Sequence, residues 1–213
     1  MSRQLSAMDR CLDRLETALR TCTPGVTQAR GHIPGHELAD TPMGPDERHH
    51  AAGLMRVNHT GEVCAQALYD GQSATAKLDR VRAQMAEAAL EEKDHLAWCE
   101  ARLRELGSRP SILNPVFYGL SFAMGAAAGA LGDRYSLGFV AATEDQVSQH
   151  LQRHLKALPE VDLRSQAIVR QMLADEQRHA EHARDAGGLA FPKPVRAGMT
   201  LLSTVMTTST YRL

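Results

Sequence analysis

Apolar residues recur at helical spacing along most of the chain. Residues 3–21 are amphipathic through five apolar side chains three or four positions apart: Leu5, Met8, Leu12, Leu15 and Leu19. After a loop rich in Pro and Gly, with Asp46 as the expected cap, the pattern predicts helices over residues 46–77, 79–106, 133–158 and 162–186, and a last helix after residue 192. No segment alternates with the period of a strand, so an all-α helix bundle is predicted.

Residues 111–132 contain no charged side chain. Their number meets the length of about 20 residues that a membrane span needs. Asn114, Pro115 and many Gly and Ala residues lower the hydrophobicity, and the helices on both sides must return to one bundle, so a span is not expected. Small residues such as Gly125 and Gly129 favour close helix contact. Two interpretations remain open: a tightly packed core helix, or a surface whose end at residues 112–124 enters a membrane interface.

Composition narrows the class of protein. A chain of 213 residues is expected to form one domain. The net charge of -1, without a basic stripe, gives no indication of nucleic acid as a partner. Four widely spaced cysteines, without a C-x-x-C pair or a secretory signal, predict free thiols in a reducing cytosol rather than disulfides or a thiolate zinc site.

Two Glu-x-x-His pairs lie in separate predicted helices: Glu92 with His95, and Glu176 with His179. Residues three apart share one helix face, so each pair can bind one metal ion or form a solvated surface pair. The helix before each pair carries a glutamate in an apolar setting, Glu62 in the first case and Glu144 in the second. Each half of the chain therefore contains the same set of candidate ligands.

The spacing places each set at one level. In the first half, the lone glutamate and the glutamate of the Glu-x-x-His pair are 30 residues apart, and their midpoint is Lys77, beside a predicted turn. In the second half they are 32 residues apart, with the midpoint at Glu160, beside Pro159. Residues equally far from the turn of an antiparallel helix pair lie at the same height, here about 22–24 Å from the turn at about 1.5 Å per residue.

Two such halves facing each other supply four carboxylates and two imidazoles: Glu62, Glu92, His95, Glu144, Glu176 and His179. This is the ligand set of a di-iron or di-manganese carboxylate bundle. Hard oxygen donors with few nitrogens favour iron or manganese over copper, and the lack of thiolate argues against structural zinc. Four carboxylates also balance the charge of two divalent ions, which makes their burial tolerable.

A third pair of the same type, Glu47 with His50, has Glu16 31 residues before it. The loop rich in Pro and Gly lies between them, so no continuous hairpin can bring them to one level. We expect no metal there.

Four segments, RVNHTGE, EEKDHLAW, TEDQVSQHL and DEQRHAEHA, resemble in this order the demethoxyubiquinone hydroxylases of ubiquinone biosynthesis. That family consists of non-haem di-iron monooxygenases with a ferritin-like four-helix bundle. The resemblance begins at about Arg56, and it indicates a hydroxylase domain over residues 46–213 after a variable N-terminal helix and loop at residues 1–45. It implies that the same six residues bind two Fe2+ ions per chain, with Glu92 and Glu176 bridging and Glu62 and Glu144 binding one iron each. Manganese can take the place of iron.

The resemblance also implies a catalytic role near the quinone pocket for His150, whereas the pattern alone is equally compatible with a partly exposed helix histidine. Many relatives have a tyrosine at the next position, where this chain has Leu151. This departure argues against a tyrosine-dependent step.

The implied reaction is hydroxylation of the ring of a polyprenyl demethoxyubiquinol by O2, with NADH as the source of electrons. No Gly-x-Gly-x-x-Gly fingerprint follows a strand, so no Rossmann site for NADH is expected. The resemblance further implies a homo-oligomer, contacts with other ubiquinone-biosynthesis proteins, and peripheral attachment to the cytoplasmic face of the cell membrane. It therefore favours the interpretation of residues 111–132 as part of a membrane-facing surface formed by additional helices.

Two other functions fit parts of the sequence. A ferritin- or rubrerythrin-like protein that stores iron or scavenges peroxide uses similar ligands, but it has no need of the uncharged stretch, and this chain has no four-cysteine electron-transfer domain. A non-enzymatic helical membrane adaptor would leave the six candidate ligands with structural roles.

Overall fold

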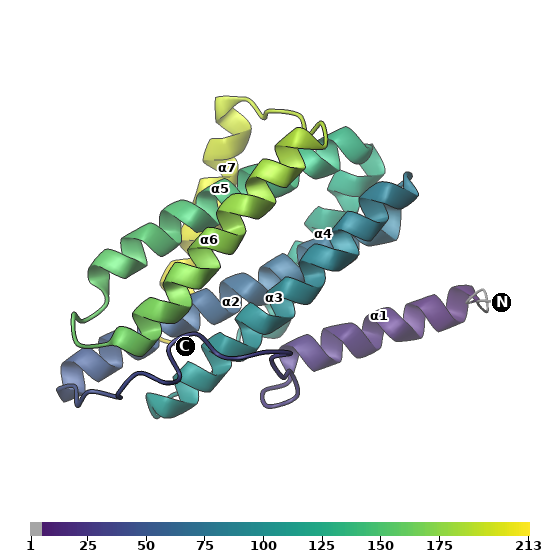
Figure 1. Cartoon of the computed structure of the whole chain (residues 1–213). Coiled ribbons are helices and arrows are strands. Elements are labelled where there is room, and N and C mark those ends of the chain that lie inside the picture. Colours follow the sequence, from purple (N-terminus) through teal and green to yellow (C-terminus); the bar gives the residue numbers. More distant parts are fainter. Residues whose placement is uncertain (1–5) are drawn as a thin grey trace.

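Two long helical hairpins form the body of the protein (Figure 1). The computed structural model describes residues 6–213, apart from the side chains of Ala7, Asp79, Arg80, Arg82, Gln84 and Ala86. Helices α2 (Pro45–Thr75) and α3 (Asp79–Glu105) make the first hairpin, and α5 (Asp133–Ala157) and α6 (Leu163–Asp185) make the second. Seven helices and no strand occur in residues 6–213, which confirms the all-α prediction and is consistent with a ferritin-like bundle.

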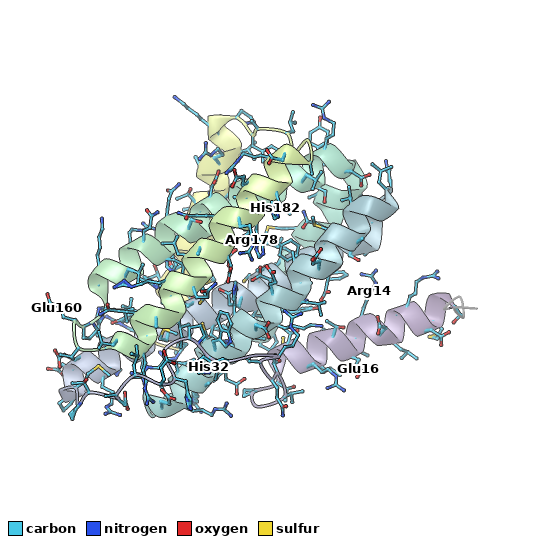
Figure 2. All side chains as sticks on the ribbon, in the orientation of Figure 1. Arg14, Glu16, His32, Glu160, Arg178 and His182 are labelled. Atoms are coloured by element: carbon cyan, nitrogen blue, oxygen red, sulfur yellow. The ribbon has the colours of Figure 1, made fainter. Side chains whose placement is uncertain are left out.

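The turns of both hairpins lie at the midpoints that the spacing predicted. Lys77 lies between α2 and α3, and Glu160 lies in the connection between α5 and α6, where Figure 2 labels it. A buried Arg102 on α3 ties the hairpins together near the second turn, because its guanidinium donates to Asp162 at 2.8 Å. The same Asp162 carboxylate accepts from the backbone N–H of Ser165 at 3.0 Å and so caps α6.

Helix α2 starts at Pro45, and Glu47 accepts a hydrogen bond from the N–H of Gly44 at 3.0 Å. The expected cap, Asp46, lies inside the first turn instead, because the proline occupies the first helical position.

Helix α1 (Ala7–Cys22) lies at the edge of the bundle (Figure 1). Ala18 and Cys22 pack against a cluster that includes Tyr118, and Arg14 donates to the backbone oxygen of Asp70 on α2 at 2.8 Å. The predicted start of this helix at residues 3–5, with Leu5, lies outside the described residues.

Helix α4 (Asn114–Leu131) lies against α2 at very short range, because glycines take the place of side chains in the contact. A Cβ atom at Gly125 would overlap the backbone of Leu68, and one at Gly71 would overlap the backbone oxygen of Phe122. Six residues of α4 are buried: Asn114, Tyr118, Ser121, Gly125, Ala128 and Gly129. The other side exposes an apolar stripe, which consists of Ile112, Val116, Leu120 and Met124. The interpretation of residues 111–132 as a core helix therefore explains the buried face of α4 but not the exposed apolar one.

The last helix, α7 (Lys193–Thr210), contacts α2 and α5 and exposes Leu201, Leu202 and Val205. The residues after it are held in place, since Arg56 donates to the backbone oxygen of Tyr211 at 2.7 Å. No helix in the described part of the chain has both the length and the apolar character that crossing a membrane requires.

The close contact between α2 and α4 predicts opposite effects of one methyl group at two positions of α4. Gly125→Ala should destabilise the protein by about 1–3 kcal/mol, because its Cβ has no room beside Leu68. Gly119→Ala is the matched control, since nothing lies within 4 Å of its added Cβ and alanine favours a helix by about 1 kcal/mol. Denaturant unfolding measures both, and a Gly125→Ala protein as stable as the control would contradict the prediction.

Candidate metal centre

The six candidate ligands converge midway along the two hairpins. They come from four helices: Glu62 from α2, Glu92 and His95 from α3, Glu144 from α5, and Glu176 and His179 from α6. Each is at most 7% exposed. Their ligand atoms form two groups, and within each group all of them lie within 4.8 Å of one another. One group contains Glu62 and His95, the other contains Glu144 and His179, and both contain Glu92 and Glu176.

The two shared carboxylates each direct one oxygen toward each imidazole. Glu92 places Oε2 3.4 Å from Nδ1 of His95 and Oε1 3.3 Å from Nδ1 of His179. Glu176 places Oε1 3.4 Å from Nδ1 of His95 and Oε2 3.4 Å from Nδ1 of His179. This is the arrangement of carboxylates that can bridge two neighbouring metal ions.

Several of these buried ligand atoms have no hydrogen-bond partner in the described part of the chain: Glu62 Oε2, Glu92 Oε1 and Oε2, His95 Nδ1, Glu144 Oε2, Glu176 Oε2 and His179 Nδ1. Buried polar atoms are normally hydrogen-bonded, because an unpaired one costs about 1–3 kcal/mol. Here they are carboxylate oxygens and imidazole nitrogens facing one another at the same place. The donor set therefore fits hard divalent metal ions such as iron or manganese.

The burial and the close spacing of the carboxylates shift the pKa values of the ligand side chains. Burial raises the pKa of Glu62 and of Glu144 well above the ordinary glutamate value, and for Glu144 the neighbouring Glu176 adds to the rise. Burial disfavours charge on the two imidazoles, but the surrounding carboxylates reverse this effect. They hold the pKa of His95 well above its ordinary value and raise the pKa of His179 to about 12. A metal ion that binds to the ligands must therefore displace protons.

Each imidazole also pairs with a carboxylate from the opposite hairpin. Nε2 of His95 on α3 lies 3.1 Å from Oδ2 of Asp175 on α6, and Nε2 of His179 on α6 lies 2.5 Å from Oε2 of Glu91 on α3. Such outer carboxylates orient a ligating histidine and raise its basicity. Sequence analysis missed both, although a signal was present: an acidic residue stands directly before each Glu-x-x-His pair, in EEKDH and in DEQRH.

Tyr69 was also missed. Its hydroxyl donates to Oε1 of Glu144 at 2.7 Å, from a position seven residues after Glu62, two turns along α2. This bond fixes one oxygen of Glu144 and leaves the other, Oε2, available as a ligand.

The third Glu-x-x-His pair lies away from the centre. Glu47 stabilises the start of α2, and His50 contacts the hydroxyl of Tyr211 at 2.6 Å and the backbone oxygen of Ala157 at 3.0 Å. Neither residue belongs to a group that can hold a metal ion among the described residues.

An apolar cavity of about 300 Å³ connects the exposed sides of α4 and α7 with the centre. Its walls are mainly apolar and include Leu68, Phe117, Leu120, Met124, Phe139, Leu202 and Met206. Leu120 and Leu202 lie at the surface, whereas Glu62 in the same wall is buried. The cavity therefore offers an apolar molecule a route to one of the ligands.

His150 lies outside both ligand groups, in the wall shared by the apolar cavity and a polar cavity of about 700 Å³ between α5 and α7. Burial, with a contribution from Arg153, lowers the pKa of His150 to about 4, so the imidazole is neutral at neutral pH. Its Nε2 is buried and has no partner among the described residues. Its ring centroid lies 3.8 Å from that of His154.

Comparison with known proteins gives one consistent result. A family profile described as "Ubiquinone biosynthesis protein COQ7" matches residues 49–210. Relatives from Ectopseudomonas mendocina (strain ymp) and Azotobacter vinelandii (strain DJ / ATCC BAA-1303), each named 3-demethoxyubiquinol 3-hydroxylase, are 60% identical over 211 residues, which is 99% of this chain and 98% of theirs. A relative of the same name from Alcanivorax borkumensis is 56% identical over 218 residues, 99% of both chains.

Both ligand groups contain Glu92 and Glu176, so we predict that each of these two carboxylates is needed for metal binding at both groups. Glu92→Ala and Glu176→Ala should each lower the amount of metal that the protein binds, because both ligand groups lose a carboxylate and the charge of any bound ions is less balanced. Glu47→Ala and His50→Ala are controls of the same residue types outside the centre. Metal analysis of the purified variants measures the difference, and two ions retained in either shared-carboxylate variant would refute the bridging arrangement.

Proposed function

Because the chain belongs to the COQ7 family of ubiquinone-biosynthesis proteins, we propose that it is a 3-demethoxyubiquinol 3-hydroxylase whose buried Glu/His centre binds two iron ions. The hydroxylase activity and its ubiquinol substrate rest on relatives of this name that match 99% of the chain at 56–60% identity. A quinol and O2 are accordingly its substrates. The number and identity of the metal ions and the electron donor are our own proposals.

One observation carries the proposal for the centre. Two ligand groups share Glu92 and Glu176, and one of them reaches the wall of an apolar cavity through Glu62. The shared carboxylates support two adjacent metal ions, and the cavity supports an apolar substrate. An iron-storing or peroxide-scavenging protein of the same fold needs the ligands but not the cavity, so the combination favours the hydroxylase.

The six ligands would hold two ferrous ions, which when bound supply the electrons and the open coordination positions for activating O2. The rest of the arrangement comes from the chain itself. Outer carboxylates orient the two imidazoles, and Tyr69 orients Glu144. The ligands are at most 7% exposed, and this burial limits the access of bulk water to the reacting ring.

The apolar cavity is proposed to bind the quinol ring and the first part of the polyprenyl tail. His150 stands in its wall as a neutral imidazole whose Nε2 has no partner among the described residues, so it can exchange a hydrogen bond or a proton with a ring hydroxyl. The adjoining polar cavity, lined by Arg153 and Arg212 among others, gives His150 a route for protons to solvent. NADH is the proposed source of electrons, as the family resemblance implies.

The exposed apolar residues of α4 and α7 are proposed to rest on the cytoplasmic face of the cell membrane. The stripe on α4 and the residues Leu201, Leu202 and Val205 on α7 lie on the two helices that form the outer walls of the cavity. Insertion of such residues into the interface would let a polyprenyl tail pass from lipid to the centre without crossing water.

The proposed function is tested by single-turnover chemistry. Iron-loaded, anaerobically reduced protein is mixed with a demethoxyubiquinol and 18O2, and the product is analysed by mass spectrometry. We expect one labelled oxygen in the hydroxylated ring. His150→Ala should retain two irons and lower the yield or rate of this product. Oxidation of iron without any hydroxylated quinol would instead support the iron-storing alternative.

A charged residue in the exposed stripe of α4 should weaken membrane binding and leave the metal centre and its reaction unchanged. Val116 is 58% exposed and lies outside the cavity wall, so Val116→Asp should fold and bind metal normally. Binding to phospholipid vesicles should fall by at least about tenfold, because an apolar side chain of this size contributes about 1.5–3 kcal/mol on burial. Turnover of a long-tailed quinol should fall with it, while that of a short-tailed analogue is kept. Gln152→Asp, on an exposed position of α5, is the control, and unchanged vesicle binding of Val116→Asp would contradict the proposed surface.

A further inference from the structure

The guanidinium of Arg178 contacts both of the outer carboxylates that pair with Nε2 of the two metal-binding imidazoles. Arg178 donates from Nη1 to Oδ1 of Asp175 at 2.8 Å and from Nη2 to Oε2 of Glu91 at 2.9 Å. These are the carboxylates that contact Nε2 of His95 and Nε2 of His179, respectively. A continuous series of polar contacts therefore runs from one metal-binding imidazole to the other through Arg178, which Figure 2 shows between α6 and α3.

The charge of Arg178 suits the two carboxylates that it contacts, but it opposes metal binding. A cation close to two divalent metal sites repels the metal ions and weakens their binding. Its geometry, however, suits the site, because the planar guanidinium offers two fixed N–H directions and can hold two carboxylates at once. A lysine carries the same charge on a single nitrogen without this fork. The benefit of an arginine here is therefore positional.

The two ends of the series differ in how firmly they are held. The Asp175 side chain is 9% exposed and also accepts from Nε2 of Gln171, at 3.1 Å to each oxygen. The Glu91 side chain is 37% exposed and lines a surface pocket of about 260 Å³ together with His179. Arg178 thus shares the support of Asp175 with Gln171, whereas at Glu91 it holds a carboxylate that reaches solvent.

We propose that Arg178 is a positioning residue that fixes both metal-binding imidazoles through Asp175 and Glu91, with its larger effect on the His179 side. This inference rests on the proposed di-metal centre. It concerns residues outside the six ligands, and it assigns to the exposed side of α6 an indirect influence on both metal sites.

The test is stepwise titration of the metal-free full-length chain with Co2+, followed by visible absorption. Glu91→Gln and Asp175→Asn assign the two binding steps, since each removes the outer carboxylate of one imidazole. Arg178→Gln should weaken the step assigned to His179 by about tenfold, the lower end of the range for loss of an outer partner, and the other step by less. Arg178→Lys should also weaken the His179 step, although it keeps the charge.

The matched control is Arg184→Gln. Arg184 lies on the same helix and pairs with a carboxylate on a neighbouring helix, Asp145 on α5, at 2.9 Å, with half of its side chain exposed. The Arg184→Gln substitution removes one positive charge from α6 and leaves the contacts of the outer carboxylates unchanged. Because the loss of one exposed charge has a small effect, Co2+ affinity should stay within about twofold of the wild type.

Three results would overturn the inference. Tighter Co2+ binding by Arg178→Gln would mean that Arg178 acts through its charge alone. Unchanged affinity at both steps would mean that it positions neither imidazole. A lower melting temperature of the metal-free variant, with both affinities unchanged, would mean a purely structural ion pair. If the wild-type chain itself fails to bind two Co2+ ions, the proposed di-metal function fails, and the inference fails with it.

Discussion

Four carboxylates buried face to face are the constraint on which the rest of this structure depends. Carboxylates in an apolar interior are unstable unless positive charge or protons accompany them. Inside the group, protons meet this condition: the carboxylates raise the pKa of both imidazoles, and burial raises the pKa of Glu62 and Glu144. Outside it, Arg178 pairs with Asp175 and Glu91, the two carboxylates that contact the imidazoles. Such an arrangement needs fixed backbones. Two helical hairpins, tied together by the buried Arg102, place the ligands of four helices around the centre.

The height of the ligands could be predicted from the sequence because the rise per residue of an α-helix is constant. Equal sequence distances from Lys77 and from Glu160 therefore translate into equal heights, and the four glutamates do meet. The same argument set aside His50, and its imidazole contacts Tyr211, away from the six ligands. The bridging roles came from family resemblance, since spacing along the chain says nothing about which carboxylate lies between two metals.

Rotation about the helix axes and docking of one hairpin on the other could not be read from spacing. For this reason the sequence analysis missed the outer carboxylates, because they contact imidazoles that lie 80 and 88 positions away in sequence. The two faces of α4 are a similar case. Its residues are all uncharged. Tyr118 turns inward, where its hydroxyl donates to Asp70 on α2 at 2.8 Å beside the glycine contact, while Leu120 turns outward. In the structure, one face of α4 is packed against α2 and the other is exposed.

The exchange of outer carboxylates between hairpins has a thermodynamic consequence. Neither hairpin alone contains a complete pair of imidazole and supporting carboxylate, so the ligand geometry exists only when the hairpins are docked. Any ion that binds this geometry and not the undocked chain must stabilise docking, by an amount that grows with the free concentration of the ion. Metal bound at the proposed centre would therefore link the folded population of the protein to the metal supply of the cell, so that scarcity of metal would lower the amount of assembled protein as well as the fraction that is loaded.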